Sequence, residues 1–254
     1  FFDMYPFLDE TAKLCEKYEL KGYLFWPVID EDKTTQKGMP IKNAERFVKQ
    51  WEKNKYVVPG FGPHAIYSCR QELLEKVVEL AEKYRAPIHM HAAETRKEVW
   101  DCYKAKGKRV IEYLESLGIL GKNTFLAHCC WVTKGEIRKL SETGTKVVHC
   151  PVSNMKLGTG GFFPMKEMKE YGVEILLGTD SSASNNTQDI WETMKFAALL
   201  AKHNYWDPSV VKAGEILKMA QRYSEGFVLV RLKIPYRRWE NIVYDRPEVV
   251  ATIK

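Results

Sequence analysis

Short apolar runs alternate with amphipathic segments along most of this chain, and this alternation restricts the folds it can adopt. The apolar runs are expected strands and the amphipathic segments expected helices, so the chain consists of repeated strand–helix units. Seven strands are expected, within FFDMY (1–5), GYLFWPVI (22–29), KYVVPGFGPHA (55–65), APIHMH (86–91), NTFLAHC (123–129), TKVVHC (145–150) and VEILLGTD (173–180). Because helical connections place successive strands parallel, the sequence predicts an α/β barrel.

A closed barrel of the TIM type, (β/α)8, has eight strands, whereas this pattern supplies seven. An open sheet would leave two unpaired edges beside an apolar interior, so we expect that the first strand–helix unit precedes Phe1 and is absent from this sequence. Beyond residue 220, GFVLVRLKIP and PEVVATIK have strand composition but no helix partner. We therefore expect a barrel domain over residues 1–220 and the C-terminal part of a small β-sandwich over residues 221–254.

The composition excludes several broad classes of protein. The 254 residues are 45% hydrophobic, enough for one large domain, and no apolar run approaches the ~20 residues of a membrane span. The net charge of +6 is spread over amphipathic segments and forms no basic stripe for nucleic acid. The six cysteines form no CxxC pair, which favours reduced thiols in a cytoplasmic protein. A monomer and a homo-oligomer are both compatible with this sequence.

Polar side chains stand at the carboxyl ends of several expected strands. They are His64, His91, His128, His149 and Asp180, with Glu94 three residues beyond His91. In a parallel barrel these ends line one pocket, so the side chains should surround a common site. Imidazoles and a carboxylate that converge there suit a divalent metal such as zinc. The sequence thus indicates a metal-dependent hydrolase.

Several of these residues also have a purely structural interpretation. Glu94 is spaced to move protons for a metal-bound water, or it is a favourable acidic residue at the start of the next helix. His128 binds the metal, orients the attacking hydroxide or is a hydrogen-bonded core histidine. His149 is either a pocket residue or a turn-stabilising one. His89 shares a strand face with His91 and is interpreted as a packed core histidine.

Asp180 carries the strongest single signal. A carboxylate one residue beyond the apolar run ILLG is costly to bury unless it is paired, hydrogen-bonded or metal-bound. Uncharged residues nearby can cap the next helix, so a metal ligand or a catalytic acid/base is favoured for Asp180. The polar stretches SNMKLGTGG (153–161) and SASNN, which contains Ser184 and Asn185, are expected to offer hydrogen bonds to the polar edge of a substrate.

The strings GPHAIYSC, IHMHAAET, AHCCW, HCPVSNMKLGTG and LGTDSSASNN together resemble the amidohydrolase superfamily. Within it they resemble the branch of 5′-methylthioadenosine/S-adenosylhomocysteine deaminases, over Phe2 to Ala220. The tail ENIVYDRPEVVATIK is similar to the C-terminal part of the family's β-sandwich. The resemblance implies an enzyme that releases ammonia from a small purine nucleoside and leaves the inosine analogue. The substrates implied are 5′-methylthioadenosine, S-adenosylhomocysteine, 5′-deoxyadenosine or adenosine.

The resemblance also implies a role for each site residue. His91 and Asp180 would bind one divalent metal, usually zinc (Zn²⁺) and sometimes iron (Fe²⁺). Glu94 would carry a proton from the metal-bound water to the purine ring, and Asp180 would pass one to the leaving ammonia. His128 would orient the hydroxide. The residues expected to contact the substrate are His64, Glu94, His149, Ser184 and Asn185.

Two departures from the family pattern leave alternatives open. The family also uses an HxH pair of metal ligands on the first barrel strand, and this chain has no such pair before His64. That strand is the one that the strand count places outside the sequence. Ser181-Ser182 stands where the family often has Gly-Ala, which leaves the substrate open. A guanine or cytosine deaminase, a triazine hydrolase, and a truncated non-catalytic barrel that serves as a binding module are the alternatives.

Overall fold

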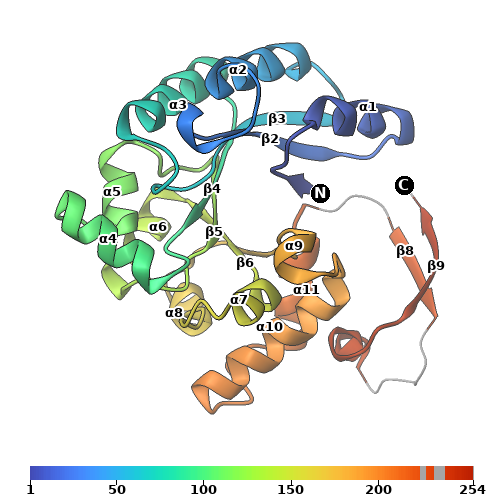
Figure 1. The fold of residues 1–254 in the computed structure, drawn as a ribbon. Helices are drawn as coiled ribbons and strands as arrows, with labels where there is room; N and C mark the ends of the chain where they lie inside the picture. The colour runs from blue at the N-terminus through green and yellow to red at the C-terminus, as the bar shows by residue number, and fades with distance from the viewer. Residues whose placement is uncertain (224–226, 232–237, 254) are drawn as a thin grey trace.

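One curled sheet of seven parallel strands organises the chain in the computed structural model, which describes residues 1–223, 227–231 and 238–253 (Figure 1). The strands lie side by side in chain order. They are β1 (Phe2–Asp3), β2 (Gly22–Val28), β3 (Val57–Pro63), β4 (Ile88–Ala92), β5 (Thr124–His128), β6 (Lys146–His149) and β7 (Ile175–Leu177). The seven strands and their parallel order confirm the sequence prediction.

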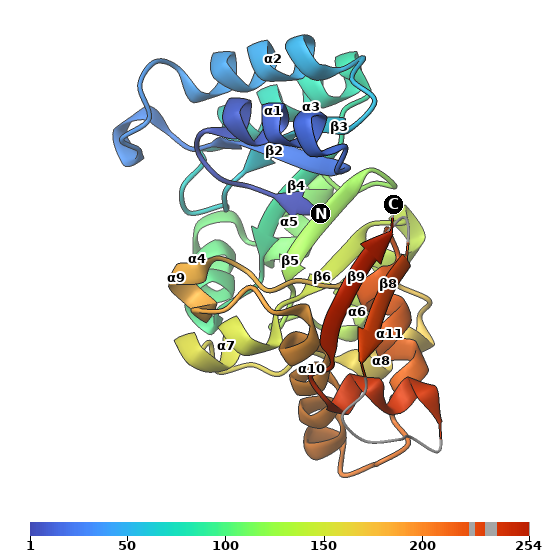
Figure 2. The ribbon, with the colours of Figure 1, turned by 90° about the vertical axis from the view of Figure 1, so that its right-hand side faces the viewer.

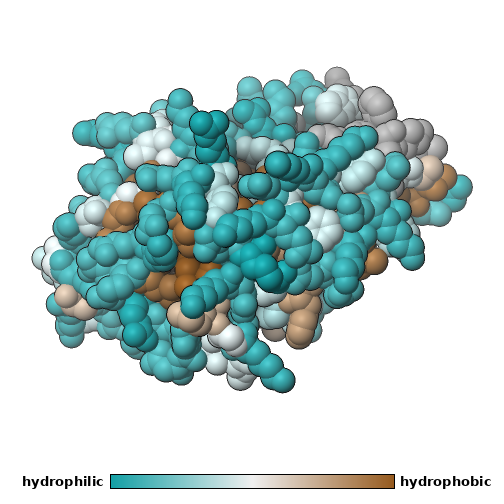
Figure 3. All heavy atoms as spheres, turned by 90° about the horizontal axis from the view of Figure 1, so that it is seen from above, coloured by the Kyte–Doolittle hydropathy of each residue, from teal (hydrophilic) through white to brown (hydrophobic). Residues whose placement is uncertain are grey.

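Helices connect the strands and cover the outer side of the sheet (Figure 1). They are α1 (Leu8–Tyr18), α2 (Pro40–Trp51), α3 (Gln71–Tyr84), α4 (Arg96–Lys106), α5 (Val110–Ser116), α6 (Lys134–Thr143), α7 (Pro151–Leu157), α8 (Met165–Glu170), α9 (Ser182–Asn185), α10 (Ile190–Tyr205) and α11 (Ala213–Gln221), with short 3-10 turns η1 (Glu31–Lys33) and η2 (Trp239–Tyr244). Seen from above in Figure 3, the exterior is largely hydrophilic, with apolar surface showing between the polar side chains. This division is typical of amphipathic helices packed on a sheet.

Turns set the bounds of two helices. Helix α4 ends at Lys106 and α5 begins only at Val110, because Gly107 adopts a left-handed conformation with φ 64°. Helix α11 begins only at Ala213, since the Asp207 carboxylate accepts a hydrogen bond from the Ser209 amide and forms a turn before it. The polar SNMKLG stretch contributes to helix α7.

The two ends of the sheet order are β1 and β7, which do not pair with each other in the described part of the chain. A cavity of about 710 Å³ lies inside the curl and reaches both edges, with Phe2 and Asp3 on one side and Leu176 and Leu177 on the other. Strand β8 (Phe227–Arg231) pairs antiparallel with β9 (Glu248–Ile253), separately from the barrel sheet (Figure 2). Within the expected sandwich segment, 224–226, 232–237 and 254 lie outside the described residues.

No helix among the described residues has the length and apolar character required to cross a bilayer.

Candidate active site

Strand β4 places His89 and His91 on the inner face of the sheet. Ile88, Met90 and Ala92 alternate with them and are buried, whereas the two histidines are half-buried and line the central cavity. Nδ1 of His91 lies 2.8 Å from the carbonyl oxygen of His64, so Nδ1 carries the hydrogen and Nε2 is left free. This arrangement is typical of metal-ligating histidines.

His89 is also hydrogen-bonded, as the sequence predicted. Its Nδ1 lies 3.0 Å from the carbonyl oxygen of Phe125, and its ring packs 5.2 Å from that of Phe25. These contacts fit a hydrogen-bonded, packed histidine, although His89 also lines the central cavity.

The backbone is left-handed at the ends of the strands around this cavity. Ala93, His128, Cys129 and Asp180 have φ values of 49°, 71°, 47° and 61°. This region is uncommon for residues with a Cβ, and such strain clusters at functional sites because the surrounding structure must hold it. The strained turns direct the side chains that follow β4, β5 and β7 towards one place.

The Asp180 carboxylate is held by two hydrogen bonds. Its Oδ2 accepts from the hydroxyl of Ser153 at 2.5 Å, and its Oδ1 accepts from the amide of Ser181 at 2.7 Å. Burial alone would raise the pKa of Asp180, but the hydrogen bonds, first that of Ser153, hold this pKa below its ordinary value. Ser181 itself caps α9, so the alternative N-cap role for Asp180 does not apply.

Glu94 and His128 face each other from the ends of β4 and β5. Oε2 of Glu94 lies 3.8 Å from Nε2 of His128, and the His128 ring is stacked 5.5 Å from that of His91. Burial lowers the pKa of His128 and raises the pKa of Glu94. Glu94 lies before the helix, because Thr95 is the N-cap of α4, so the helix-start interpretation of Glu94 does not apply.

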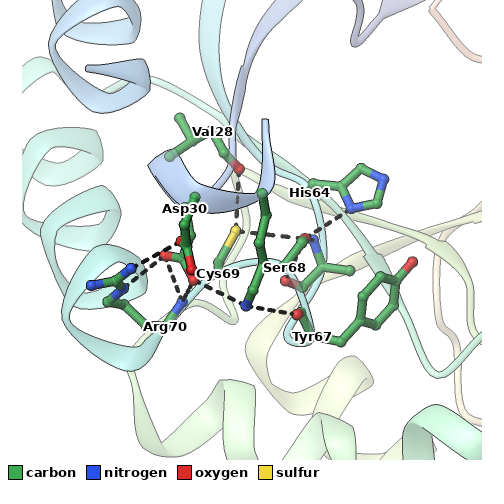
Figure 4. A network of polar contacts seen from close by, with 10 residues as sticks. Val28, Asp30, His64, Tyr67, Ser68, Cys69 and Arg70 are labelled. Carbon is green, nitrogen blue, oxygen red and sulfur yellow. Dashed lines mark hydrogen bonds and ion pairs between the residues drawn. The ribbon is translucent and has the colours of Figure 1, made fainter. Parts of the chain in front are cut away.

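His64 joins this cluster from the loop after β3. Its ring lies 4.9 Å from that of His91, and its Nδ1 lies 2.9 Å from the Ser68 hydroxyl (Figure 4). The loop is anchored by buried Asp30, which accepts hydrogen bonds from the amide and guanidinium of Arg70 and from Lys33. The end of β2 therefore fixes the loop that carries His64.

Three residues expected to contact the substrate lie elsewhere. His149 is 2% exposed and stacks on Phe163 with ring centroids 4.2 Å apart. Ser184 and Asn185 are buried, and Asn185 donates to the carbonyl oxygen of Thr179 at 2.7 Å. None of the three is among the described residues that line the central cavity, and the same is true of His64, Glu94 and His128. The contacts of His149, Ser184 and Asn185 are with the protein itself, and their contact with a substrate stays a prediction.

Sequence reasoning placed Ser153 and Asn154 in a stretch expected to contact the substrate and missed their role in supporting the site. Ser153 and Asn154 are 0% and 6% exposed and contact Asp180 and His128. Glu98 is 6% exposed, and its Oε2 accepts from the amide of Glu94 at 2.8 Å. The signal for the first two was their position directly after Pro151, in the first turn of a helix that begins at a strand end.

The donors present fit part of a metal site. A free imidazole nitrogen on His91 and the ionised carboxylate of Asp180 are ligands that zinc accepts. A catalytic zinc site takes three protein ligands, and the described residues contain no group of three His, Cys, Asp or Glu arranged to hold a metal.

Comparison with known proteins identifies related chains. The profile of the Amidohydrolase family matches residues 3–221. The chain is 38% identical over 218 residues to a 5′-deoxyadenosine deaminase of Methanothrix thermoacetophila, covering 86% of this chain and 51% of the relative. It is 38% identical over 222 residues to a 5-methylthioadenosine/S-adenosylhomocysteine deaminase of Pyrococcus furiosus, covering 87% and 53%. The chain thus spans about half the length of these relatives.

A solved structure has the same fold. It is an adenosine deaminase from Xanthomonas campestris with bound zinc, 28% identical, with a TM-score of 0.81. The superposition covers 98% of this chain and 54% of the other.

Proposed function

Because this chain belongs to the amidohydrolase family, we propose that its protein hydrolytically deaminates adenosine-type nucleosides. The proposed substrates are 5′-methylthioadenosine, S-adenosylhomocysteine, 5′-deoxyadenosine and adenosine, and the products are ammonia and the inosine analogue. The observation that carries the proposal is the facing pair of Glu94 and His128, 3.8 Å apart, next to the free imidazole nitrogen of His91. Relatives with deaminase names at 38% identity support the substrate class.

We assign His91 and Asp180 as ligands of one divalent metal, zinc with iron(II) as the alternative. A metal bound there lowers the pKa of a water from ~15.7 towards ~7, which makes a nucleophile available at neutral pH. The remaining ligands are proposed to come from a strand that pairs in the gap between β1 and β7. The cavity that reaches both of these edges supports this assignment.

The residues of this chain then divide the proton transfers. Glu94 accepts a proton from the attacking water and delivers it to the ring nitrogen next to C6. Neutral His128 accepts a hydrogen bond from the same water and orients it. Asp180 takes the second proton of that water from the hydroxyl now bonded to C6 and passes it to the amino group, and the C–N bond breaks as ammonia leaves and the C6 carbonyl forms. His64, fixed by Ser68, helps to hold the substrate.

The test is ammonia release by the zinc-loaded protein from each of the four nucleosides. Glu94→Gln should lower turnover by about 10²- to 10⁴-fold, because it removes the group that moves the proton. Glu75→Gln, on the surface of α3, is the matched control and should keep the wild-type rate. Bound zinc without ammonia from any of the four would contradict the proposal and favour a non-catalytic binding module.

We also propose that the protein is located in the cytoplasm. Residues 221–254 are proposed to be the C-terminal part of a small β-sandwich. Six free, buried cysteines support a reducing compartment. The antiparallel pair of β8 and β9, separate from the barrel sheet, supports a β element distinct from the barrel. Assembly into a homo-oligomer stays a prediction.

A further inference from the structure

The side chain of Asn154 contacts the buried imidazole of His128. Its Oδ1 lies 2.8 Å from Nδ1 of His128, and the two residues are 6% and 1% exposed. Asn154 comes from the first turn of α7, which follows β6, whereas His128 ends β5. A side-chain amide can present either its oxygen or its N–H to Nδ1 of a neutral imidazole. If the oxygen faces Nδ1, Nδ1 carries the hydrogen, and if the N–H faces it, the hydrogen is on Nε2.

Cys130 fixes the orientation of the Asn154 amide. The Cys130 thiol donates to the carbonyl oxygen of His128, 3.7 Å from the sulfur. Burial raises the pKa of Cys130 to about 12, so the thiol keeps its single hydrogen and that hydrogen is already used. The sulfur is then an acceptor only, and it lies 3.0 Å from Nδ2 of Asn154. With the thiol hydrogen on that carbonyl oxygen, Nδ2 donates to the sulfur and Oδ1 is the atom that faces His128.

We propose that Asn154 is a positioning residue that holds His128 as the tautomer with its hydrogen on Nδ1 and its lone pair on Nε2. A reversed amide would place Oδ1 against the sulfur, and the thiol could bond to it only by turning its hydrogen away from the carbonyl oxygen of His128. It would also place an N–H against Nδ1, which would move the imidazole hydrogen to Nε2. The contacts of Cys130 therefore favour the first arrangement, because the reversed one gives up the bond from the thiol to the carbonyl oxygen of His128.

The tautomer determines how His128 acts on water. Nε2 of His128 and Oε2 of Glu94, 3.8 Å apart, become two acceptors that cannot bond to each other. A single water between them can donate one O–H to each, which directs an oxygen lone pair away from both. This step rests on the proposed function, because it assigns that water as the nucleophile of the deamination. The opposite tautomer would donate from Nε2 to Glu94 and occupy the carboxylate that must take the proton.

The tautomer can be measured without any activity. We would label the histidines with ¹⁵N and record long-range ¹⁵N–¹H spectra of the purified protein, with His128→Gln to identify the His128 signals. A protonated Nδ1 and an unprotonated Nε2 are expected. Asn154→Asp should retain this pattern, because a carboxylate oxygen also accepts from Nδ1, and Asn154→Leu should lose it. A protonated Nε2 in the wild-type protein would overturn the proposal, whether or not Asn154→Leu folds.

Kinetics provide the second readout. Asn154→Leu should lower kcat by about 10- to 100-fold, the usual effect of losing such a partner, with little change in KM. Asn154→Asp should recover most of the rate, which a merely structural role would not explain. Asn54→Leu, which removes an asparagine that bonds the amides of Tyr56 and Val57, controls for general loss of stability. If the wild-type protein has the expected tautomer but releases no ammonia, the proposed function is contradicted and the proposal on the His128 tautomer stands.

Discussion

The Ser153 hydroxyl donates a hydrogen bond of 2.5 Å to Oδ2 of Asp180 and so joins helix α7 to the end of strand β7. Ser153 is fully buried, and its hydroxyl has no exposure to water that could replace the bond. The neighbouring Asn154 holds His128 at the end of β5. Two adjacent residues thus fix the side chains at two strand ends. A substitution at Ser153 should therefore change the orientation of the proposed metal ligand Asp180.

Ser153→Ala should weaken zinc binding by about 10- to 100-fold, because a ligand that loses its hydrogen-bond partner is less well oriented. The measurement is a zinc titration in competition with a chelator. Ser141→Ala is the matched control, since Ser141 bonds the carbonyl oxygen of Tyr171 away from the site. Equal zinc affinities in both variants would contradict the role of Asp180 as a ligand supported by Ser153.

The strands were predictable because each is a short apolar run that ends at a polar residue. That His91 and Asp180 line one cavity was also predictable from the barrel, since parallel strands end at one edge. The supporting residues were not, because Ser153 and Asn154 look like ordinary polar residues until the strained turns at His128 and Asp180 bring partners to them.

Ser184 and Asn185 show a second limit of the sequence. Their polar character suggested contact with substrate, but the sharp turn after β7 leaves backbone groups that must be satisfied inside the protein. Ser184 donates to the carbonyl oxygen of Ser181, and Asn185 donates to that of Thr179. Composition alone cannot tell a side chain that faces a pocket from one that satisfies its own loop.

Asp30→Ala should destabilise the protein by about 1.5–3 kcal/mol, because it removes the acceptor for charged and backbone donors on Arg70 and Lys33. It should also raise KM for a nucleoside, since the loop that carries His64 loses its anchor. Urea denaturation and initial rates would test the two effects.

The matched control for that change is Asp32→Ala. Asp32 also pairs with Arg70, but its side chain is 67% exposed, so its loss should alter the free energy of unfolding by less than about 1 kcal/mol. Similar losses of stability in the two variants would contradict the role of Asp30 as the anchor of the loop that carries His64.

Gly161→Ala should destabilise the protein by about 1–3 kcal/mol, because the added Cβ would lie 2.7 Å from Nε1 of Trp131. That nitrogen donates to the carbonyl oxygen of Thr159 and holds the loop after α7. Gly121→Ala, where nothing lies within 4 Å of the added Cβ, should change the free energy of unfolding by no more than about 0.5 kcal/mol. Thermal denaturation of the two variants would compare them, and a harmless Gly161→Ala would show that Trp131 can move away.

Glu98→Gln should change the pH dependence of stability. Burial raises the pKa of Glu98 from 4.5 to about 7 in the folded protein. Between these values the folded state holds a proton that the unfolded state has released, so this group makes the wild-type protein less stable as the pH rises from 4.5 to about 7. Glutamine cannot ionise, so the variant should gain about 3 kcal/mol relative to wild type between about pH 4 and pH 8.

Urea denaturation of Glu98→Gln and wild type at the two pH values measures this gain. Thr95→Ala is the matched control. It removes the hydroxyl that accepts a hydrogen bond from the Glu98 amide at the start of the same helix, and it removes no ionisable group. Its difference from wild type should be the same at both pH values. A constant difference for Glu98→Gln as well would mean that Glu98 releases its proton at the same pH in the folded and unfolded protein. That result would contradict the effect of burial on the pKa of Glu98, whose side chain is only 6% exposed.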